Sequence, residues 1–174
     1  SYRGIAADEG AGRVFDATTL LWRCQLHGLV PPGHDPADPA VADAVAPMAD
    51  VVPAVAVAYH VAAGLAAVGD VDGLERLGDA ATTSDAPGAA ELVPHLARGL
   101  AAFVRDDHVT AATELGHVVD DLDRIGGSLA QAEVVTDTWI EALIRADRDA
   151  EADAALRARL DRRPTWLEAA WLAS

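Results

Sequence analysis

The fold is decided by residues 53–74, which read PAVAVAYHVAAGLAAVGDVDGL. Residues 53–68 are apolar around nearly the whole surface of a helix, which predicts a central, buried helix. Gly69-Asp70 then interrupts the pattern, because glycine commonly follows the end of a helix. A shorter helix is expected over residues 71–81, with Leu74 five positions after the glycine. The stretch therefore predicts two consecutive helices joined by a tight turn.

Two later turns keep the same offset to a small residue. Asp106-Asp107 is followed by Ala111, and Asp147-Arg148 is followed by Ala152. Tetratricopeptide units place an alanine after a turn in this way, at a point where two helices touch closely. The spacing predicts helix pairs that stack on one another.

Further residues fit this register. Leu115 and Leu156 fall four positions after the two alanines, on the same helix face, and Pro164 stands where such units close. The units are spaced by more than the roughly 34 residues of a standard repeat, and any array of α-hairpins produces a similar pattern. We expect residues 1–174 to form one all-α domain, a right-handed α-solenoid of antiparallel helix pairs, that is, a tetratricopeptide-like superhelix.

The N-terminal part predicts two more helices. Asp16 is a good N-cap, so the first helix is expected to begin there and to turn Leu20 and Leu21 toward the core. The second is expected to open at Asp38-Pro39, because proline is favoured in a first helical turn, and Pro47 would end or kink it. No segment alternates with period two for long enough to predict a strand.

Composition limits the kinds of partner. The chain has 28 acidic and 13 basic residues and a net charge of −15, so it repels phosphate backbones and anionic lipid surfaces. We expect no nucleic acid and no membrane among its partners; a cationic partner is permitted, and a charged coat for solubility is the alternative. The single cysteine, Cys24, allows no intramolecular disulfide, and no segment has the roughly 20 apolar residues of a membrane span. A cytoplasmic location fits best.

Several motifs resemble the tetratricopeptide repeat protein 38-like family. They are residues 16–23 (DATTLLWR), residues 124–128 (RIGGS), a helix ending in residues 141–143 (EAL), and the pair over residues 150–164. The resemblance implies an α-solenoid that forms the C-terminal part of a longer protein, and it implies no particular activity.

The chain also departs from the family pattern. After the Gly-Gly-Ser run the family typically carries histidine, then Ala-Gln, then arginine, whereas this chain has Leu129 and Ala132 at the first and last of these positions. A site built on that histidine and arginine would be lost or altered here. In a second family run, Asp-x-His-Ala, only His60 matches.

His60 is the main candidate for a binding residue, because it is the lone strongly polar group in its apolar helix. A buried imidazole needs hydrogen-bond partners, so His60 and the adjacent Tyr59 either contact a ligand in a groove or belong to the core. The core interpretation of His60 is favoured. Trp166 and Trp171, in the last predicted helix, either cap the core or form a contact patch for a partner.

Catalytic and metal signatures are weak. Glu133, Asp137 and Glu141 share one helix face and could in principle hold a cation, but metal ligands usually converge from several elements, so we expect a solvated outer face. Cys24 and His27 lie three positions apart without an orienting partner, which favours Cys24 as a small core residue. We expect no catalytic residue, no metal and no cofactor.

These patterns predict a protein- or ligand-binding scaffold rather than an enzyme. An unknown protein, peptide or small molecule would lie on the concave face formed by the first helices of successive pairs. The alternative is a helical subdomain of an enzyme or small-molecule-binding protein whose site is completed by a missing N-terminal part. A purely architectural dimerisation role is a third hypothesis.

Overall fold

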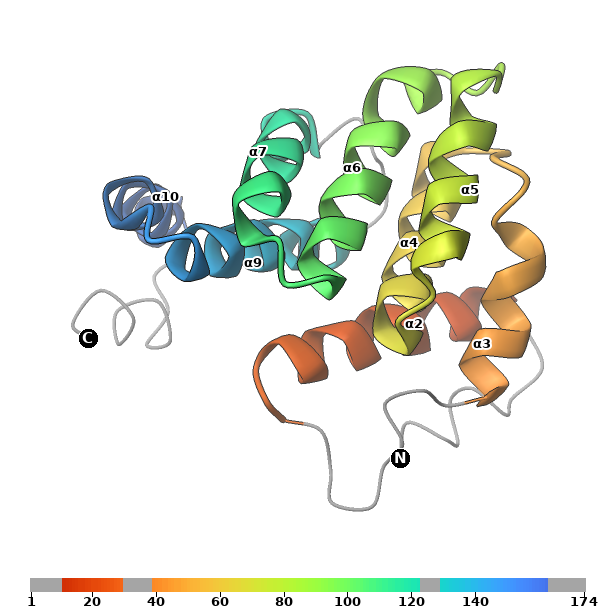
Figure 1. The fold of residues 1–174 in the computed structure, drawn as a ribbon, viewed down its shortest axis with the longest axis horizontal. Helices are drawn as coiled ribbons and strands as arrows, with labels where there is room; N and C mark the ends of the chain where they lie inside the picture. Colours follow the sequence, from red (N-terminus) through yellow and green to blue (C-terminus); the bar gives the residue numbers. More distant parts are fainter. Residues whose placement is uncertain (1–10, 30–38, 123–128, 163–174) are drawn as a thin grey trace.

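A computed structural model of the chain describes residues 11–29, 39–122 and 129–162. Within these ranges every regular element is a helix, so the prediction of an all-α protein is confirmed (Figure 1). The elements are α2 (Ala11–Leu26), α3 (Pro39–Val45), the short 3-10 helix η1 (Ala46–Met48), α4 (Val55–Val68), α5 (Val71–Thr82), α6 (Ala89–Val104), α7 (His108–Val119), α9 (Leu129–Arg145) and α10 (Asp149–Arg162).

Most predicted helix ends lie close to those observed, but the start of α2 does not. α4 and α5 meet at Gly69-Asp70, and Pro47 lies in the 3-10 turn that ends α3. α2 begins at Ala11, so Asp16 lies inside the helix and the predicted N-cap is wrong. Once a helix is nucleated, each added residue gains a backbone hydrogen bond, so a good capping residue does not by itself start a helix. Leu20 is 44% exposed rather than in the core, because α2 buries its opposite face.

Three turns between consecutive helices share one backbone geometry. The backbone is left-handed at Gly69, Asp106 and Asp147, with φ of 72°, 60° and 56°. The next residue of each turn donates its N–H to a carbonyl five positions back: Asp70 to Leu65, Asp107 to Ala102 and Arg148 to Leu143, each at 2.9 Å. These bonds satisfy carbonyl groups that a helix end leaves free.

The residues after these turns lie in the core. Leu74, Ala111 and Ala152 are 0%, 0% and 3% exposed. Leu115 and Leu156, four positions later in the second and third cases, are buried as well. The positions at which the sequence predicted close helix contacts are therefore buried. Pro164 lies outside the described residues.

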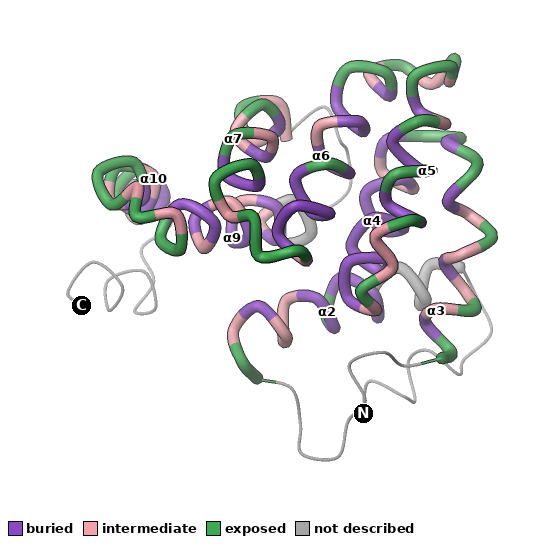
Figure 2. The backbone as a smooth tube through the Cα atoms, viewed as in Figure 1, coloured by how far each residue is buried: buried purple, intermediate pink, exposed green. Residues whose placement is uncertain are grey.

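α4 and α6 run through the middle of the molecule. α6 packs between α5 and α7 and also contacts α4, while α9 packs against α7 and α10 (Figure 1). Figure 2 shows buried residues along nearly all of α4, which confirms the prediction of a central, buried helix. Glycine permits the closest approaches: a Cβ at Gly99 of α6 would lie 2.7 Å from the Leu115 side chain, and one at Gly64 of α4 would lie 2.7 Å from Val45.

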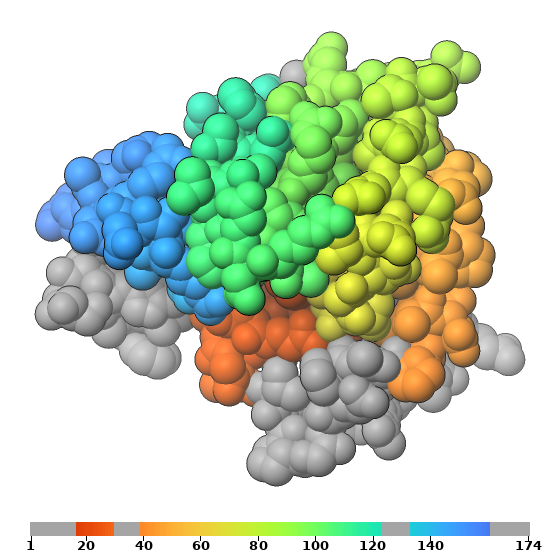
Figure 3. Space-filling model, viewed as in Figure 1, coloured from red at the N-terminus to blue at the C-terminus, as the bar shows by residue number. Residues whose placement is uncertain are grey.

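α2 connects parts of the chain that are far apart in sequence. It packs along α4 and also contacts α9. Trp22 donates its indole N–H to Thr138 Oγ1 at 3.0 Å, across 116 positions, and its ring meets the Phe103 ring of α6 edge-on at 5.7 Å. The side chains of α2 therefore lie between α4, α6 and α9, and the space-filling view shows α2 directly below α7 and α4 (Figure 3).

Candidate functional site

Tyr59 and His60 lie in the contact between α2 and α4. Their residues are 3% and 7% exposed. His60 Nδ1 lies 2.9 Å from Thr19 Oγ1, and the His60 carbonyl accepts a hydrogen bond from Thr18 Oγ1 at 3.1 Å. Burial raises the pKa of the Tyr59 phenol above its usual value, although hydrogen bonding with Thr19 opposes the shift. Both side chains are built into the core, and neither offers a surface to a partner.

The predicted tryptophan patch cannot be placed, since Trp166 and Trp171 lie outside the described residues. The other two tryptophans are packing residues. Trp22 is 6% exposed, and Trp139 of α9 is half-buried and donates its indole N–H to the Ala112 carbonyl of α7 at 3.0 Å. Each indole thus ties α9 to another helix.

The acidic face predicted for α9 is only partly solvated. Asp137 is 2% exposed, which contradicts the expectation of an outer face. Arg159 of α10 donates a short hydrogen bond to Asp137 Oδ1, and Arg23 Nη2 of α2 lies 3.1 Å from Oδ2. His27 Nε2 lies 3.9 Å from the same oxygen. Asp137 therefore joins α2, α9 and α10 through one buried carboxylate.

The charges around Asp137 explain how it tolerates burial. Burial alone would raise the pKa of this carboxyl, but the contact with His27 and the positive charges of Arg159 and Arg23 outweigh it and hold the pKa below its usual value. Glu133 completes the group, 3.7 Å from Arg159 and 4.0 Å from Arg23. Two carboxylates thus face two guanidinium groups, an arrangement that links α2, α9 and α10.

No local pattern predicted this burial. Val134 and Ile140 flank the acidic face of α9 on the helix surface, and both are buried. The solvated face of an ordinary amphipathic helix is also bordered by apolar residues, so these neighbours do not distinguish the two cases. Glu141, by contrast, behaves as expected and pairs with Arg145 at 2.8 Å on the surface.

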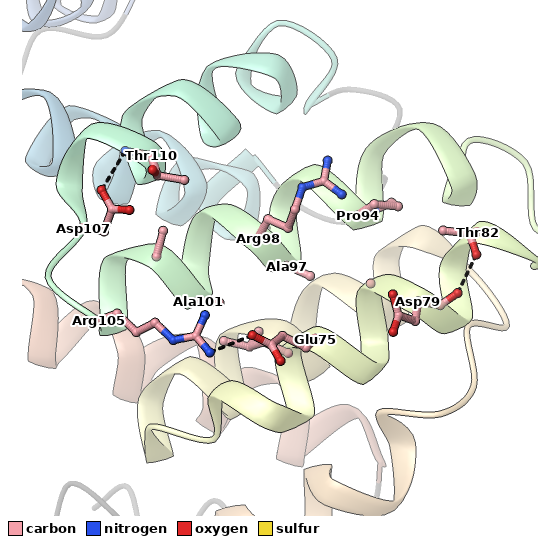
Figure 4. Close-up of a pocket in the computed structure, with 13 residues that line it drawn as sticks. Glu75, Asp79, Thr82, Pro94, Ala97, Arg98, Ala101, Arg105, Asp107 and Thr110 are labelled. Carbon is pink, nitrogen blue, oxygen red and sulfur yellow. Dashed lines mark hydrogen bonds and ion pairs between the residues drawn. The ribbon is translucent and has the colours of Figure 1, made fainter.

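A groove of about 470 Å³ follows α6 between α5 and the start of α7 (Figure 4). Its floor consists of small or compact residues, namely Gly78, Pro94, Ala97, Ala101 and Ala102. Small side chains leave the helix backbones close to the surface there. The sequence analysis did not single out this groove, because its floor combines residues from helices whose packing is set by the fold.

Charged side chains form the walls of the groove. Glu75 of α5 pairs with Arg105 of α6 at 2.6 Å, and both side chains are half exposed (Figure 4). Arg98 is held by Glu114 of α7 at 3.1 Å. Asp79 lies along the α5 wall beside these pairs. The groove therefore offers an apolar floor with charges of both signs at its rim.

A second hollow of about 440 Å³ lies where α2, α4, α6 and α9 end. Trp22 and Phe103 contribute aromatic rings, and Asp106 and Arg145 contribute charges. The Arg145 guanidinium carbon lies 5.2 Å from the centre of the Phe103 ring. This hollow thus combines aromatic surface with a cation that already contacts it.

The described residues hold no group of three or more histidine, cysteine, aspartate or glutamate residues placed to bind a metal. Every helix in the described ranges is too short or too polar to cross a membrane. The chain matches no protein-family model, no curated protein and no solved structure. The resemblance to the tetratricopeptide repeat protein 38-like family accordingly remains a prediction that rests on its motifs.

Proposed function

We propose that the chain is a tetratricopeptide-like, helical-repeat interaction module of the cytoplasm that binds an extended segment of a partner protein in the groove along α6. The observation that carries this proposal is the groove itself, an open channel with a small-residue floor and charged walls. The three turns of identical backbone geometry support the repeat architecture. A right-handed solenoid of antiparallel pairs is part of the same proposal.

The dimensions of the groove suit a polypeptide. Its floor follows α6 from Pro94 to Arg105, a length of about 17 Å at the helical rise per residue. An extended chain covers this length with about five residues. Small side chains such as Ala97 and Gly78 would let the main chain of the segment approach closely.

The charged walls would supply selectivity. The Glu75–Arg105 pair is exposed, and such pairs stabilise a protein by no more than about 1 kcal/mol. A partner side chain can therefore replace either member at little cost. Since both signs are present, the groove favours a segment that carries charged residues on either side of a small apolar centre.

The concave face first expected to bind a partner is less suitable. α2 occupies the space beside α4 and α9, where Trp22 donates a hydrogen bond to Thr138. The alternative of an enzyme subdomain would use Tyr59 and His60, which are buried and engaged with α2. The groove along α6 lies at the surface, and among the residues that line it only the exposed Glu75–Arg105 pair crosses it.

The proposal is tested by selecting peptides that bind the protein and then measuring their binding to a variant in which a large side chain blocks the groove. Peptides selected from a random phage-displayed library against the parent protein are measured by calorimetry on the parent and on Asp79→Trp, which places a large ring at the exposed rim. We expect the variant to weaken binding at least about tenfold, or about 1.4 kcal/mol. The matched control is Asp72→Trp, an exposed aspartate of the same helix that does not line the groove. Peptides that bind parent and Asp79→Trp equally would refute the groove as the site.

A further inference from the structure

The hollow at the ends of α2, α4, α6 and α9 is surrounded by the C-terminal ends of four helices. Trp22 and Gln25 line it from the last turns of α2, residues 66–69 from the end of α4, Phe103, Val104 and Asp106 from the end of α6, and Arg145 from the end of α9. The C-terminus of a helix carries a partial negative charge, because its peptide dipoles are aligned. Four such ends converge on one hollow of about 440 Å³.

Aromatic rings form one wall of this hollow. Trp22 and Phe103 meet edge to face, with centroids 5.7 Å apart and an interplanar angle of 80°. The face of an aromatic ring is its negative side and attracts cations, and arginine does so most often. The ring wall and the helix ends therefore favour the same sign of ligand charge.

The molecule already places one cation there. The Arg145 guanidinium lies over the Phe103 ring at 5.2 Å, anchored by Glu141 at 2.8 Å. The side chain of Arg145 is 40% exposed and covers Phe103, which is 7% exposed, so a ligand that stacks on this ring has to displace Arg145. Asp106, whose side chain is 86% exposed, adds a carboxylate at the rim of the hollow.

We propose that this hollow binds an arginine side chain from a basic segment of a partner protein, which stacks on Phe103 and pairs with Asp106. The net charge of −15 attracts such a segment over a longer range. Arg145 acts as an internal competitor for the ring face. The site is separate from the groove along α6, and none of its residues lines that groove.

The probe is a capped Gly-Arg-Gly-Arg-Gly peptide at low ionic strength, compared with the same peptide carrying citrulline in place of arginine. Citrulline has nearly the shape of arginine but is neutral, and a carbonyl acceptor replaces one of its NH2 donors. Binding is followed through the NMR signal of the Trp22 indole N–H, assigned with Trp22→Phe. We expect the citrulline peptide to bind at least about three- to tenfold more weakly. Equal binding of the two peptides would overturn the proposal.

Two variant pairs test the site itself. Asp106→Asn keeps a residue that tolerates the left-handed turn but removes the charge, and we expect about threefold weaker binding. Its control, Asp147→Asn, makes the same change at φ 56° in a turn that does not line the hollow. We expect Asp147→Asn to bind like the parent.

Arg145→Gln gives the most specific result, because it removes the internal competitor and should strengthen binding of the arginine peptide about threefold. The control Arg157→Gln removes the same charge from an arginine that also pairs with an acid four positions earlier. If Arg145→Gln binds no better than Arg157→Gln, the stacking site is wrong. Phe103→Leu should abolish the difference between these two variants, with circular dichroism confirming that it folds.

Discussion

The buried contacts around α6 are mainly apolar, whereas the buried contacts of α2 include several polar groups. Around α6, helices that follow one another in the chain meet through small apolar residues, as at Gly99 against Leu115 and at Gly78 against Ala97. α2 meets its distant neighbours through buried polar groups as well as apolar side chains. The polar contacts include Thr18 and Thr19 with His60, Trp22 with Thr138, and Arg23 with Asp137.

The difference follows from chain connectivity. Helices joined by the three turns are already held in register by those turns, so non-directional apolar contacts complete the packing. α2 and α9 are more than 100 positions apart, and no turn aligns them. Hydrogen bonds and ion pairs have preferred geometries, so they can select one register where connectivity cannot.

The strongest way to break the polar contact is Asp137→Asn. The change leaves the buried Arg159 with only the more distant Glu133 carboxylate, 3.7 Å away, and removing one member of a buried pair costs about 3–5 kcal/mol. Urea unfolding measures this free energy. Glu141→Gln, on the same helix face but in an exposed pair, should cost less than about 1 kcal/mol. If the two variants lose the same free energy of unfolding, the buried ion pairs of Asp137 do not stabilise the fold more than an exposed pair does.

The apolar contacts can be broken at the residues after the turns. Ala111→Asp and Ala152→Asp would each bury an unpaired carboxylate, and we expect each to lower the free energy of unfolding by about 3 kcal/mol. Ala154→Asp, at an exposed position of α10, is the control and should change it by no more than about 0.5 kcal/mol. Unchanged melting of both buried variants would show that the helix register is misplaced.

His60→Gln tests the contact between α2 and α4. Loss of the hydrogen bond between His60 and Thr19 in a dry site should cost about 1–3 kcal/mol. Thr19→Val removes the same bond from the other side. The double variant should lose less than the sum of the two single variants, because both remove one interaction. If His60→Gln has the same melting temperature as the parent, the bond is not structural, and His60 is again a candidate ligand contact.

The smallest effect concerns acid pH. An aspartate in an unfolded chain titrates near about pH 3.9, and the pKa of Asp137 is lower in the folded protein. The ionised group therefore contributes stability above about pH 3.9, and this contribution is lost as the pH falls through the folded pKa. The gap in unfolding free energy between the parent and Asp137→Asn should narrow as the pH falls into the acid range. A gap that stays constant into acid would exclude Asp137 as the titrating group.

The helices and their turns were predictable because their causes are local. The apolar residues of α4, the glycine at position 69 and the offset to Ala111 and Ala152 lie within a few positions of what they determine. The N-cap at Asp16 was wrong because capping preference competes with continued helix growth. The burial of Asp137 was missed because its partners Arg23 and Arg159 come from other helices.

By itself, the sequence determined the helical class, the positions of the three turns, the burial of α4 and the acidic surface, because periodicity, turn residues and charge act over short stretches or over the whole composition. Only the tertiary structure decided which polar residues meet. It brought α2 against α9 and turned Asp137 inward. It also opened the groove along α6 and gathered four helix ends around Phe103. These features depend on distances between residues far apart in the chain, and such distances are set by the packing of whole helices.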